Sequence, residues 1–180
     1  MPMEILRAPW RMEYIEPDSS EDKKESKEDQ RGNFKTACIF CDFAADDMDE
    51  ENLILPRGKR SFVIMNKYPY SVGHLLIVPY RHTADLVSLS DEEKLEIFAF
   101  SQKSVFVLKK IMNPDGFNIG MNLGKAAGAG IETHLHLHVV PRWSGDINFI
   151  SVVAETKVLP EALGVSYRKI LCEWKIWENP

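Results

Sequence analysis

The chain has 180 residues, which suits one domain of average size with a hydrophobic core of its own. Its formal net charge is −5 and it contains no basic stripe, so a nucleic-acid partner held by phosphate neutralisation is not expected. No apolar run reaches the roughly 18 residues of a membrane span, and the few cysteines do not form a secreted disulfide framework, so we expect a cytoplasmic protein without a membrane partner.

The N-terminal part of the chain divides into an apolar segment and a charged one. Residues 5–15 are rich in aromatic and aliphatic side chains, whereas residues 16–31 contain neither kind. A segment without apolar side chains buries too little surface to offset the entropy lost on ordering. We therefore predict an N-terminal arm and mobile linker over residues 1–33, followed by a folded domain over residues 34–150.

Cys38 and Cys41 have the two-residue separation of a zinc knuckle. The same spacing occurs in redox pairs and by chance, although no βαβ pattern of a thioredoxin fold surrounds it here. A tetrahedral zinc site needs two further ligands, and His82 and His134 are the candidates. The residues alone leave both the metal site and the redox pair open.

Two strands are predicted on either side of a turn. Residues 62–67 and 74–78 are rich in aliphatic side chains, and the Tyr-Pro-Tyr-Ser-Val-Gly segment between them supplies turn residues. The two strands are expected to pair antiparallel. Asn66 lies at the end of the first strand, where a turn-forming role and a ligand contact are both open, and His74 follows the turn.

A long helix is predicted after these strands. Ser90 and Glu93 have the spacing of a capping box. Leu95, Phe98 and Phe106 follow at helical spacing, which extends the helix to residue 112, and we expect this apolar stripe to lie in the core.

Two further elements follow the long helix. Residues 117–121 are predicted to form a strand. Residues 151–180 are predicted to form a C-terminal extension with an amphipathic helix after Pro160.

Residues 122–130 form a loop of small side chains that contains three glycines. Glycine allows backbone N–H groups to approach an anion and point at it, as in phosphate-binding loops. A loop that is merely flexible is the alternative. Because three histidines follow it closely, we favour a phosphate-binding loop.

His134, His136 and His138 occur at a spacing of two, with aliphatic residues between them. Strict alternation is the period of a β-strand, so the three imidazoles are predicted to share one face and the aliphatic side chains the other. Imidazole serves as nucleophile, general acid or metal ligand near neutral pH. The motif therefore predicts a catalytic face that suits an anionic substrate.

These motifs resemble the histidine triad family, and within it the bacterial diadenosine tetraphosphate phosphorylases. The resemblance rests on HLHLHVVPRW, on residues 62–82 and on residues 120–130, and it covers roughly residues 34–150. It implies an α+β fold, with an antiparallel sheet of about five strands and two main helices. It also implies a homodimer that extends the sheet, and no organic cofactor.

The resemblance assigns roles to individual residues. His136 is the implied nucleophile, His138 contacts a phosphate oxygen and the leaving group, and His134 orients the strand. Ribose hydroxyls are bound near Asn66, and His74 lies behind the triad. The implied α-phosphate contacts are Asn122, Gly128, Ala129 and Gly130. The implied ligands of a structural zinc ion are Cys38, Cys41, His82 and His134.

The implied reaction is nucleotidyl transfer on a dinucleoside polyphosphate through a covalent nucleotidyl-histidine. Phosphorolysis of diadenosine tetraphosphate to ADP and ATP is favoured, because the loop lacks the Gln or Ser that the hydrolases use. The segment from Arg142 to Phe149 also resembles the phosphorylase motif. The alternatives are a hydrolase of dinucleoside polyphosphates or nucleoside phosphoramidates, and a non-catalytic nucleotide-binding module. Hexose-1-phosphate nucleotidyl transfer is disfavoured, because that family has proline where this chain has Leu137.

Overall fold

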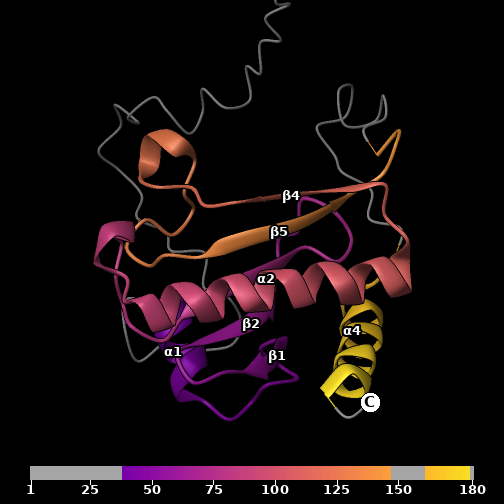
Figure 1. The fold of residues 1–180 in the computed structure, drawn as a ribbon, viewed down its shortest axis with the longest axis horizontal. Coiled ribbons are helices and arrows are strands. Elements are labelled where there is room, and N and C mark those ends of the chain that lie inside the picture. The colour runs from indigo at the N-terminus through magenta and orange to yellow at the C-terminus, as the bar shows by residue number, and fades with distance from the viewer. Residues whose placement is uncertain (1–37, 147–160, 179–180) are drawn as a thin grey trace, which may run out of the picture. The chain divides into compact units, whose positions relative to one another are not determined.

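The computed structural model describes residues 38–146 and 161–178, all of which belong to the compact unit of residues 34–180 (Figure 1). The predicted arm and linker over residues 1–33 lie outside the described residues, as do residues 147–160. The predicted division into residues 1–33, 34–150 and 151–180 therefore stays a prediction. Within the described part of the chain, no helix combines the length and apolarity needed to cross a membrane.

Five antiparallel strands form one sheet in the order β1-β2-β3-β5-β4. The strands are β1 (Ile54–Arg57), β2 (Ser61–Met65), β3 (Leu75–Pro79), β4 (Gly116–Gly120) and β5 (Leu137–Arg142). The two strands predicted around the turn are β2 and β3, which pair antiparallel with Met65 opposite Leu75. The predicted strand over residues 117–121 is β4. The predicted α+β fold with an antiparallel sheet is therefore confirmed.

Three α-helices accompany the sheet in the described part of the chain. They are α1 (Ile39–Ala45), α2 (Asp91–Met112) and α4 (Leu163–Glu178), with short 3-10 helices η2 (Leu86–Ser88) and η3 (Lys125–Ala127). The predicted capping box is present at the start of α2, since the side chains of Ser90 and Glu93 each accept a backbone N–H of the other. Asn113 ends α2 in a left-handed conformation with φ of 45°. The two main helices of the prediction are α2 and α4.

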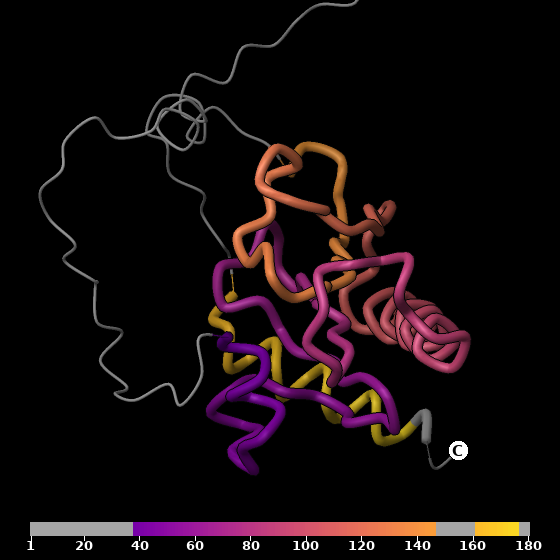
Figure 2. The backbone as a smooth tube through the Cα atoms, turned by 90° about the vertical axis from the view of Figure 1, so that its left-hand side faces the viewer, coloured from indigo at the N-terminus to yellow at the C-terminus, as the bar shows by residue number. Residues whose placement is uncertain are grey.

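The helices cover both faces of the sheet. Val63 and Met65 of β2 pack in the cluster that contains residues of α2 and α4, whereas Phe62 and Ile64 pack in the cluster that contains Phe40 of α1. The alternation follows from the period of the strand. In Figure 2, α2 is viewed nearly along its axis and lies on the opposite side of the strands from α1. Every residue of β2 and β3 is buried as a result.

The prediction that the stripe of Leu95, Phe98 and Phe106 lies in the core is wrong. These side chains are 76%, 64% and 49% exposed. The face of α2 that packs on the sheet contains Ile97 and Leu108, together with small and polar residues such as Ser101, Ser104 and Lys103. Helical periodicity identifies a face but not what covers it, and the face that packs on the sheet is apolar as well, because it carries Val107 and the partly buried Phe100 and Ile111.

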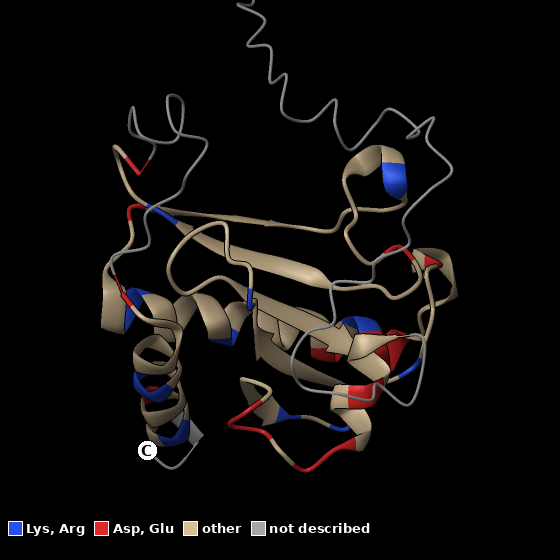
Figure 3. Ribbon diagram, turned by 180° about the vertical axis from the view of Figure 1, so that it is seen from behind, with Lys and Arg blue, Asp and Glu red and all other residues tan. Residues whose placement is uncertain are grey.

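Arg57 fixes α1 against the sheet. Its guanidinium donates to the carbonyl oxygens of Phe43 and Ala44 at the end of α1, and to the carboxylate of Asp49. Acidic side chains gather in the loop of residues 46–51 between α1 and β1 (Figure 3). Arg57 therefore offsets part of this negative charge and holds the helix that begins directly after Cys38.

Candidate active site and metal cluster

Only one of the three triad histidines lies within a strand. β5 begins at Leu137, so His138 lies in the strand, whereas His134 and His136 lie in the segment that leads into it. The N–H of Leu135 donates to the carbonyl of Thr83 at 2.7 Å instead of joining the ladder. The alternation still holds, since Leu135 and Val139 pack in the cluster beneath α2. All three imidazoles are buried.

His134 is one of the four residues that were predicted to bind zinc, and it lies beside the other three. Its Nε2 lies 2.9 Å from the carbonyl oxygen of Pro79. A carbonyl only accepts, so Nε2 carries the proton and the lone pair is on Nδ1. That Nδ1 faces the sulfur atoms, at 3.2 Å from Cys38 Sγ and 3.6 Å from Cys41 Sγ. The tautomer of His134 is therefore the one that binds a metal through Nδ1.

The geometry of this cluster fits a tetrahedral cation. Its ligand atoms all lie within 4.8 Å of one another, and they come from Cys38, Cys41, His82 and His134. Tetrahedral zinc bonds of roughly 2.0–2.3 Å imply ligand-to-ligand distances of roughly 3.3–3.8 Å. The Nδ1 atoms of the two histidines are 3.3 Å apart, and Cys41 Sγ lies 3.3 Å from His82 Nδ1. Two thiols and two imidazoles are also the ligand set that zinc prefers.

The electrostatics of the cluster favour a proton on Cys41 in the metal-free chain. Burial, and then the neighbouring Cys38, raise the pKa of its thiol to about 11. Burial lowers the pKa of His134. Binding of a divalent cation would therefore release the proton of the Cys41 thiol, because a metal coordinates the thiolate.

His136 is held by the main chain of His134. Its Nδ1 lies 2.9 Å from the carbonyl oxygen of His134, so Nδ1 donates and the lone pair is on Nε2. Phe40 of α1 lies against the ring, with centroids 5.2 Å apart. Burial lowers the pKa of His136, which the hydrogen bond to the carbonyl opposes. A neutral imidazole with a free Nε2 lone pair is the form that acts as a nucleophile.

His138 is oriented by a hydrogen-bond relay that begins at Tyr70. The backbone N–H of Tyr70 donates to His74 Nδ1 at 3.0 Å, which leaves the proton of His74 on Nε2. That Nε2 donates to His138 Nδ1 at 2.9 Å, so His138 carries its proton on Nε2. This Nε2 is buried and has no hydrogen-bond partner among the residues that the structure describes. Burial, and then His136, lower the pKa of His138 to about 4, so the ring is neutral near pH 7.

Asn66 lies beside this relay. Its Oδ1 accepts the N–H of Tyr68 at 2.9 Å, and its Nδ2 lies 3.2 Å from His74 Nδ1. The turn-forming role that the sequence left open is therefore present. A ribose contact by Asn66 stays a prediction.

The small-residue loop after β4 closes on itself. The N–H of Gly128 donates to the carbonyl of Lys125 at 2.8 Å, and Asn122 Nδ2 donates to the carbonyl of Gly128 at 3.4 Å. Gly124 and Gly128 have positive φ angles of 77° and 82°, which few other residues adopt. Binding of the α-phosphate stays a prediction for Asn122, Gly128, Ala129 and Gly130.

Arg142, in the segment that resembles the phosphorylase motif, stabilises a turn. Its guanidinium donates to both carboxylate oxygens of Asp146 at 2.6 and 2.8 Å, and to Asn118 Oδ1 at 2.8 Å. Arg142 lies four positions after His138 along the strand, which is roughly 13 Å at the usual rise. Arg142 therefore stabilises the turn at the end of β5. Residues 147–149 of the motif lie outside the described residues.

Comparison with known proteins agrees with this geometry. The model of the HIT domain matches residues 49–145, which contain His82, the relay and all three triad histidines. The chain belongs to the HIT domain family. The resemblance to the histidine triad family is thereby confirmed, and Cys38 and Cys41 precede the matched part of the HIT domain.

Other proteins are similar to this HIT domain in sequence and in fold. A Mycobacterium tuberculosis protein named AP-4-A phosphorylase is 48% identical over 126 residues, a match that covers 70% of this chain and 65% of that protein. The chain thus spans just under two thirds of that relative. A Zn-bound histidine triad family protein from Mycobacterium smegmatis superposes with a TM-score of 0.64 at 26% identity, over 79% of this chain and 96% of that one.

A third protein, from Sulfolobus tokodaii, shares the fold. It has a TM-score of 0.64 at 24% identity, over 78% of this chain and 94% of that one.

The sequence did not indicate three contributors to the site. Phe40 packs on two triad rings, the carbonyl of Pro79 fixes the tautomer of His134, and Tyr70 begins the relay and stacks on His138 with ring planes 13° apart. Two of the three act through main-chain atoms, and nearly every amino acid has these atoms, so the residue type does not reveal the contact. Residue type could have indicated only the two ring contacts, which are made by the aromatic side chains of Phe40 and Tyr70.

Proposed function

We propose that this protein cleaves dinucleoside polyphosphates by nucleotidyl transfer through His136, with diadenosine tetraphosphate as substrate and inorganic phosphate as acceptor. The observation that carries the reaction class is the bond from His136 Nδ1 to the carbonyl of His134, which leaves a nucleophilic Nε2. The similarity to the AP-4-A phosphorylase supports the substrate and the acceptor.

In the first step, His136 Nε2 forms a bond to the α-phosphorus while the bond from phosphorus to the polyphosphate oxygen breaks. The imidazole keeps its Nδ1 proton and becomes cationic, and the His134 carbonyl stabilises that charge through the existing hydrogen bond. His138 Nε2–H, which lies on the same face, donates to a phosphate oxygen as negative charge develops there.

In the second step, an oxygen of inorganic phosphate attacks the same phosphorus and the phosphorus–nitrogen bond breaks. The electron pair returns to His136 Nε2, which restores the neutral ring. The released nucleotide is ADP, and the ATP leaves after the first step. The small side chains of residues 126–130 leave space for the second anion, which a water molecule would not need.

The four-residue cluster is proposed to hold a structural zinc ion. Zinc with four protein ligands has no open position, so when bound it supplies a cross-link and not an electrophile. The ligands join the start of α1, the segment after β3 and the entry to β5. The histidines and the main chain, and not the metal, bind the substrate and fix the positions of the protons.

The second partner we propose is another copy of this chain. Among residues 38–146 and 161–178, β4 pairs only with β5 and forms an edge of the sheet. Phe117 and Met121 pack in the cluster beneath α2, so Ile119 between them points to the same side and is 49% exposed. The exposed stripe of α2 lies on that side as well. Pairing of β4 with its copy would cover the free edge and bring the two stripes together.

The acceptor is tested by isotope labelling. Purified protein is incubated with diadenosine tetraphosphate and ¹⁸O-labelled inorganic phosphate, and the products are identified by mass spectrometry. Phosphorolysis gives ADP and ATP in equal amounts, with the label in the β-phosphate of ADP. A phosphate-independent rate that yields AMP and ATP, with ¹⁸O in AMP only from labelled water, would show that the protein is a hydrolase.

A further inference from the structure

Residues 79–83, which begin at the last residue of β3, contact the metal cluster and the triad at three points. The Pro79 carbonyl accepts His134 Nε2–H, His82 supplies one ligand nitrogen, and the Thr83 carbonyl accepts the N–H of Leu135. Pro79 still pairs with Ser61, and the N–H of Tyr80 donates to the carbonyl of Arg60 at 2.9 Å, so residues 81–83 are the part that lies beyond the ladder. The position of residues 81–83 depends on other contacts.

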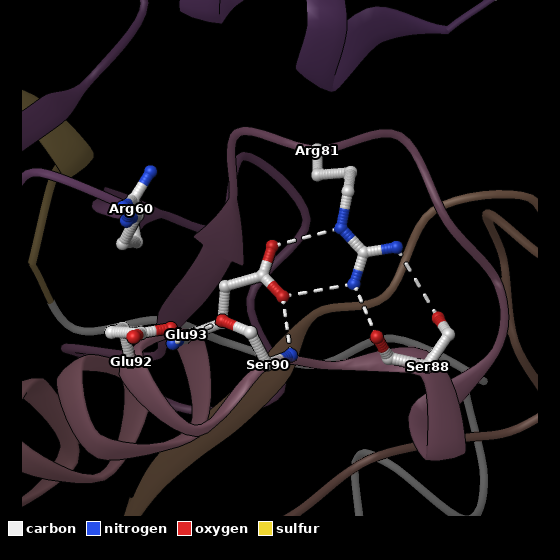
Figure 4. A pocket seen from close by; sticks show the side chains of 6 residues that line it. All are labelled: Arg60, Arg81, Ser88, Ser90, Glu92 and Glu93. Atoms are coloured by element: carbon white, nitrogen blue, oxygen red, sulfur yellow. Dashed lines mark hydrogen bonds and ion pairs between the residues drawn. The ribbon is translucent and has the colours of Figure 1, made fainter.

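Arg81 supplies those contacts from the middle of the segment. Its Nε and Nη2 donate to the two carboxylate oxygens of Glu93 at 2.9 and 2.8 Å, and Nη2 also donates to the carbonyl of Ser88 at 2.8 Å (Figure 4). The planar guanidinium thereby ties the segment to η2 and to the first turn of α2. A lysine could not form this fork, because its ammonium is a single point charge.

Glu93 is itself held in one position. Its Oε2 accepts the N–H of Ser90 at 2.8 Å in the capping box, and its side chain is only 8% exposed. Both carboxylate oxygens are therefore occupied, and the rotamer is fixed by the start of α2. Together with Ser88 and Ser90, this pair lines a pocket of about 410 Å³ that contains none of the histidines.

From these contacts we infer that Arg81 and Glu93 are positioning residues of the metal cluster, which bring His82 to the other three ligands before any metal binds. The inference rests on the zinc site of the proposed function. The start of α2 determines where residues 81–83 lie, and this short segment determines where His82 Nδ1 lies. Loss of the pair would let His82 move away, so zinc would bind more weakly and leave faster.

The test compares two variants that each lose one ion pair. Glu93→Gln keeps an oxygen for the Ser90 N–H but cannot accept both bonds from Arg81. The control is Glu173→Gln, which breaks the ion pair between Glu173 of α4 and Lys110 of α2. The two pairs have matched side-chain exposures, 8% and 44% for Glu93 and Arg81 against 11% and 53% for Glu173 and Lys110.

The measurement is metal binding by the full chain under reducing conditions. Co²⁺ is added first, because tetrahedral thiolate coordination gives a characteristic absorption, and zinc affinity then follows from competition with a chromophoric chelator. We expect Glu93→Gln to weaken zinc binding by about 10- to 100-fold, as is usual for residues that orient metal ligands, while Glu173→Gln stays within about twofold of wild type. Arg81→Lys, which keeps the charge but loses the fork, replaces Glu93→Gln if that variant does not fold.

Two results would overturn the inference, and they are distinguishable. If the wild-type chain shows no tetrahedral cobalt spectrum, the zinc assignment itself fails and the positioning role fails with it. If the wild type binds zinc and Glu93→Gln binds it as tightly as Glu173→Gln does, only the positioning role is wrong.

Discussion

The relay from Tyr70 through His74 to His138 predicts a specific effect of removing His74. In His74→Phe, a ring of similar size replaces the imidazole but has no N–H to donate to His138 Nδ1. His138 then loses the bond that fixes both its ring orientation and the proton on Nε2. We expect the rate of nucleotidyl transfer to fall, since the donor at the developing negative charge is no longer held in place.

The size of the effect follows from the burial of the relay. His74 and His138 are 0% and 8% exposed, so water does not replace the lost donor. Leaving a buried polar group unpaired costs about 1–3 kcal/mol, which corresponds to a fall in rate of roughly 5- to 150-fold. The loss is expected in kcat more than in KM, because the charge develops only in the transition state.

The assay is the rate of diadenosine tetraphosphate cleavage at saturating phosphate. His136→Ala sets the lower limit of the cleavage rate. We expect it to lower this rate by about 10³-fold or more, because the nucleophile is absent. Ser104→Ala controls for general destabilisation, since it removes a buried hydroxyl that donates to the carbonyl of Phe100 within α2. ¹⁵N NMR of the imidazoles reports the tautomers directly.

Two results would refute the relay. One is a His74→Phe protein that is folded and has a kcat within about twofold of wild type, well outside the range set by an unpaired buried group. The other is a wild-type spectrum in which His138 carries its proton on Nδ1.

Two further predictions concern assembly and acid stability. Phe98→Glu places a charge in the exposed stripe of α2 and should convert a dimer to a monomer in sedimentation experiments. A wild-type chain that is monomeric at all concentrations would contradict the proposed interface. The hydrogen bonds from Arg81 lower the pKa of Glu93 from 4.5 to about 2, so its contribution to the free energy of unfolding is present above pH 4.5 and is lost as the pH falls towards 2. Because Arg81 is 44% exposed, we expect about 1–2 kcal/mol after screening by solvent. Urea unfolding of wild type and Glu93→Gln should therefore differ at pH 7 and converge near pH 2, and a constant difference would exclude the ion pair as the cause.

The sequence predicted elements whose signals are local. The capping box at Ser90 and Glu93 depends on side chains three residues apart, so the start of α2 was found at the correct residue. Alternation around His138 identified both faces of the strand for the same reason. The start of β5 was not predicted correctly, because pairing partners decide where a strand begins, and Leu135 bonds to Thr83 instead.

The features that the sequence did not reveal depend on distant partners. The burial of α2 is set by what packs against it, and the serines at 101 and 104 face the sheet while Phe98 faces outwards. The four candidate metal ligands were found because their side chains are chemically distinctive. The tautomers of the histidines were not, because a backbone N–H and two carbonyl groups determine them.

His134 serves the two halves of the site through different atoms. Its imidazole belongs to the metal cluster, but the group that holds His136 is its backbone carbonyl, which every amino acid possesses. During divergence, the side chain at this position is therefore free to change together with the two cysteines without altering the tautomer of the nucleophile. Metal dependence and nucleotidyl chemistry are consequently separable traits, and a lineage could lose the first in a few substitutions while the second persists.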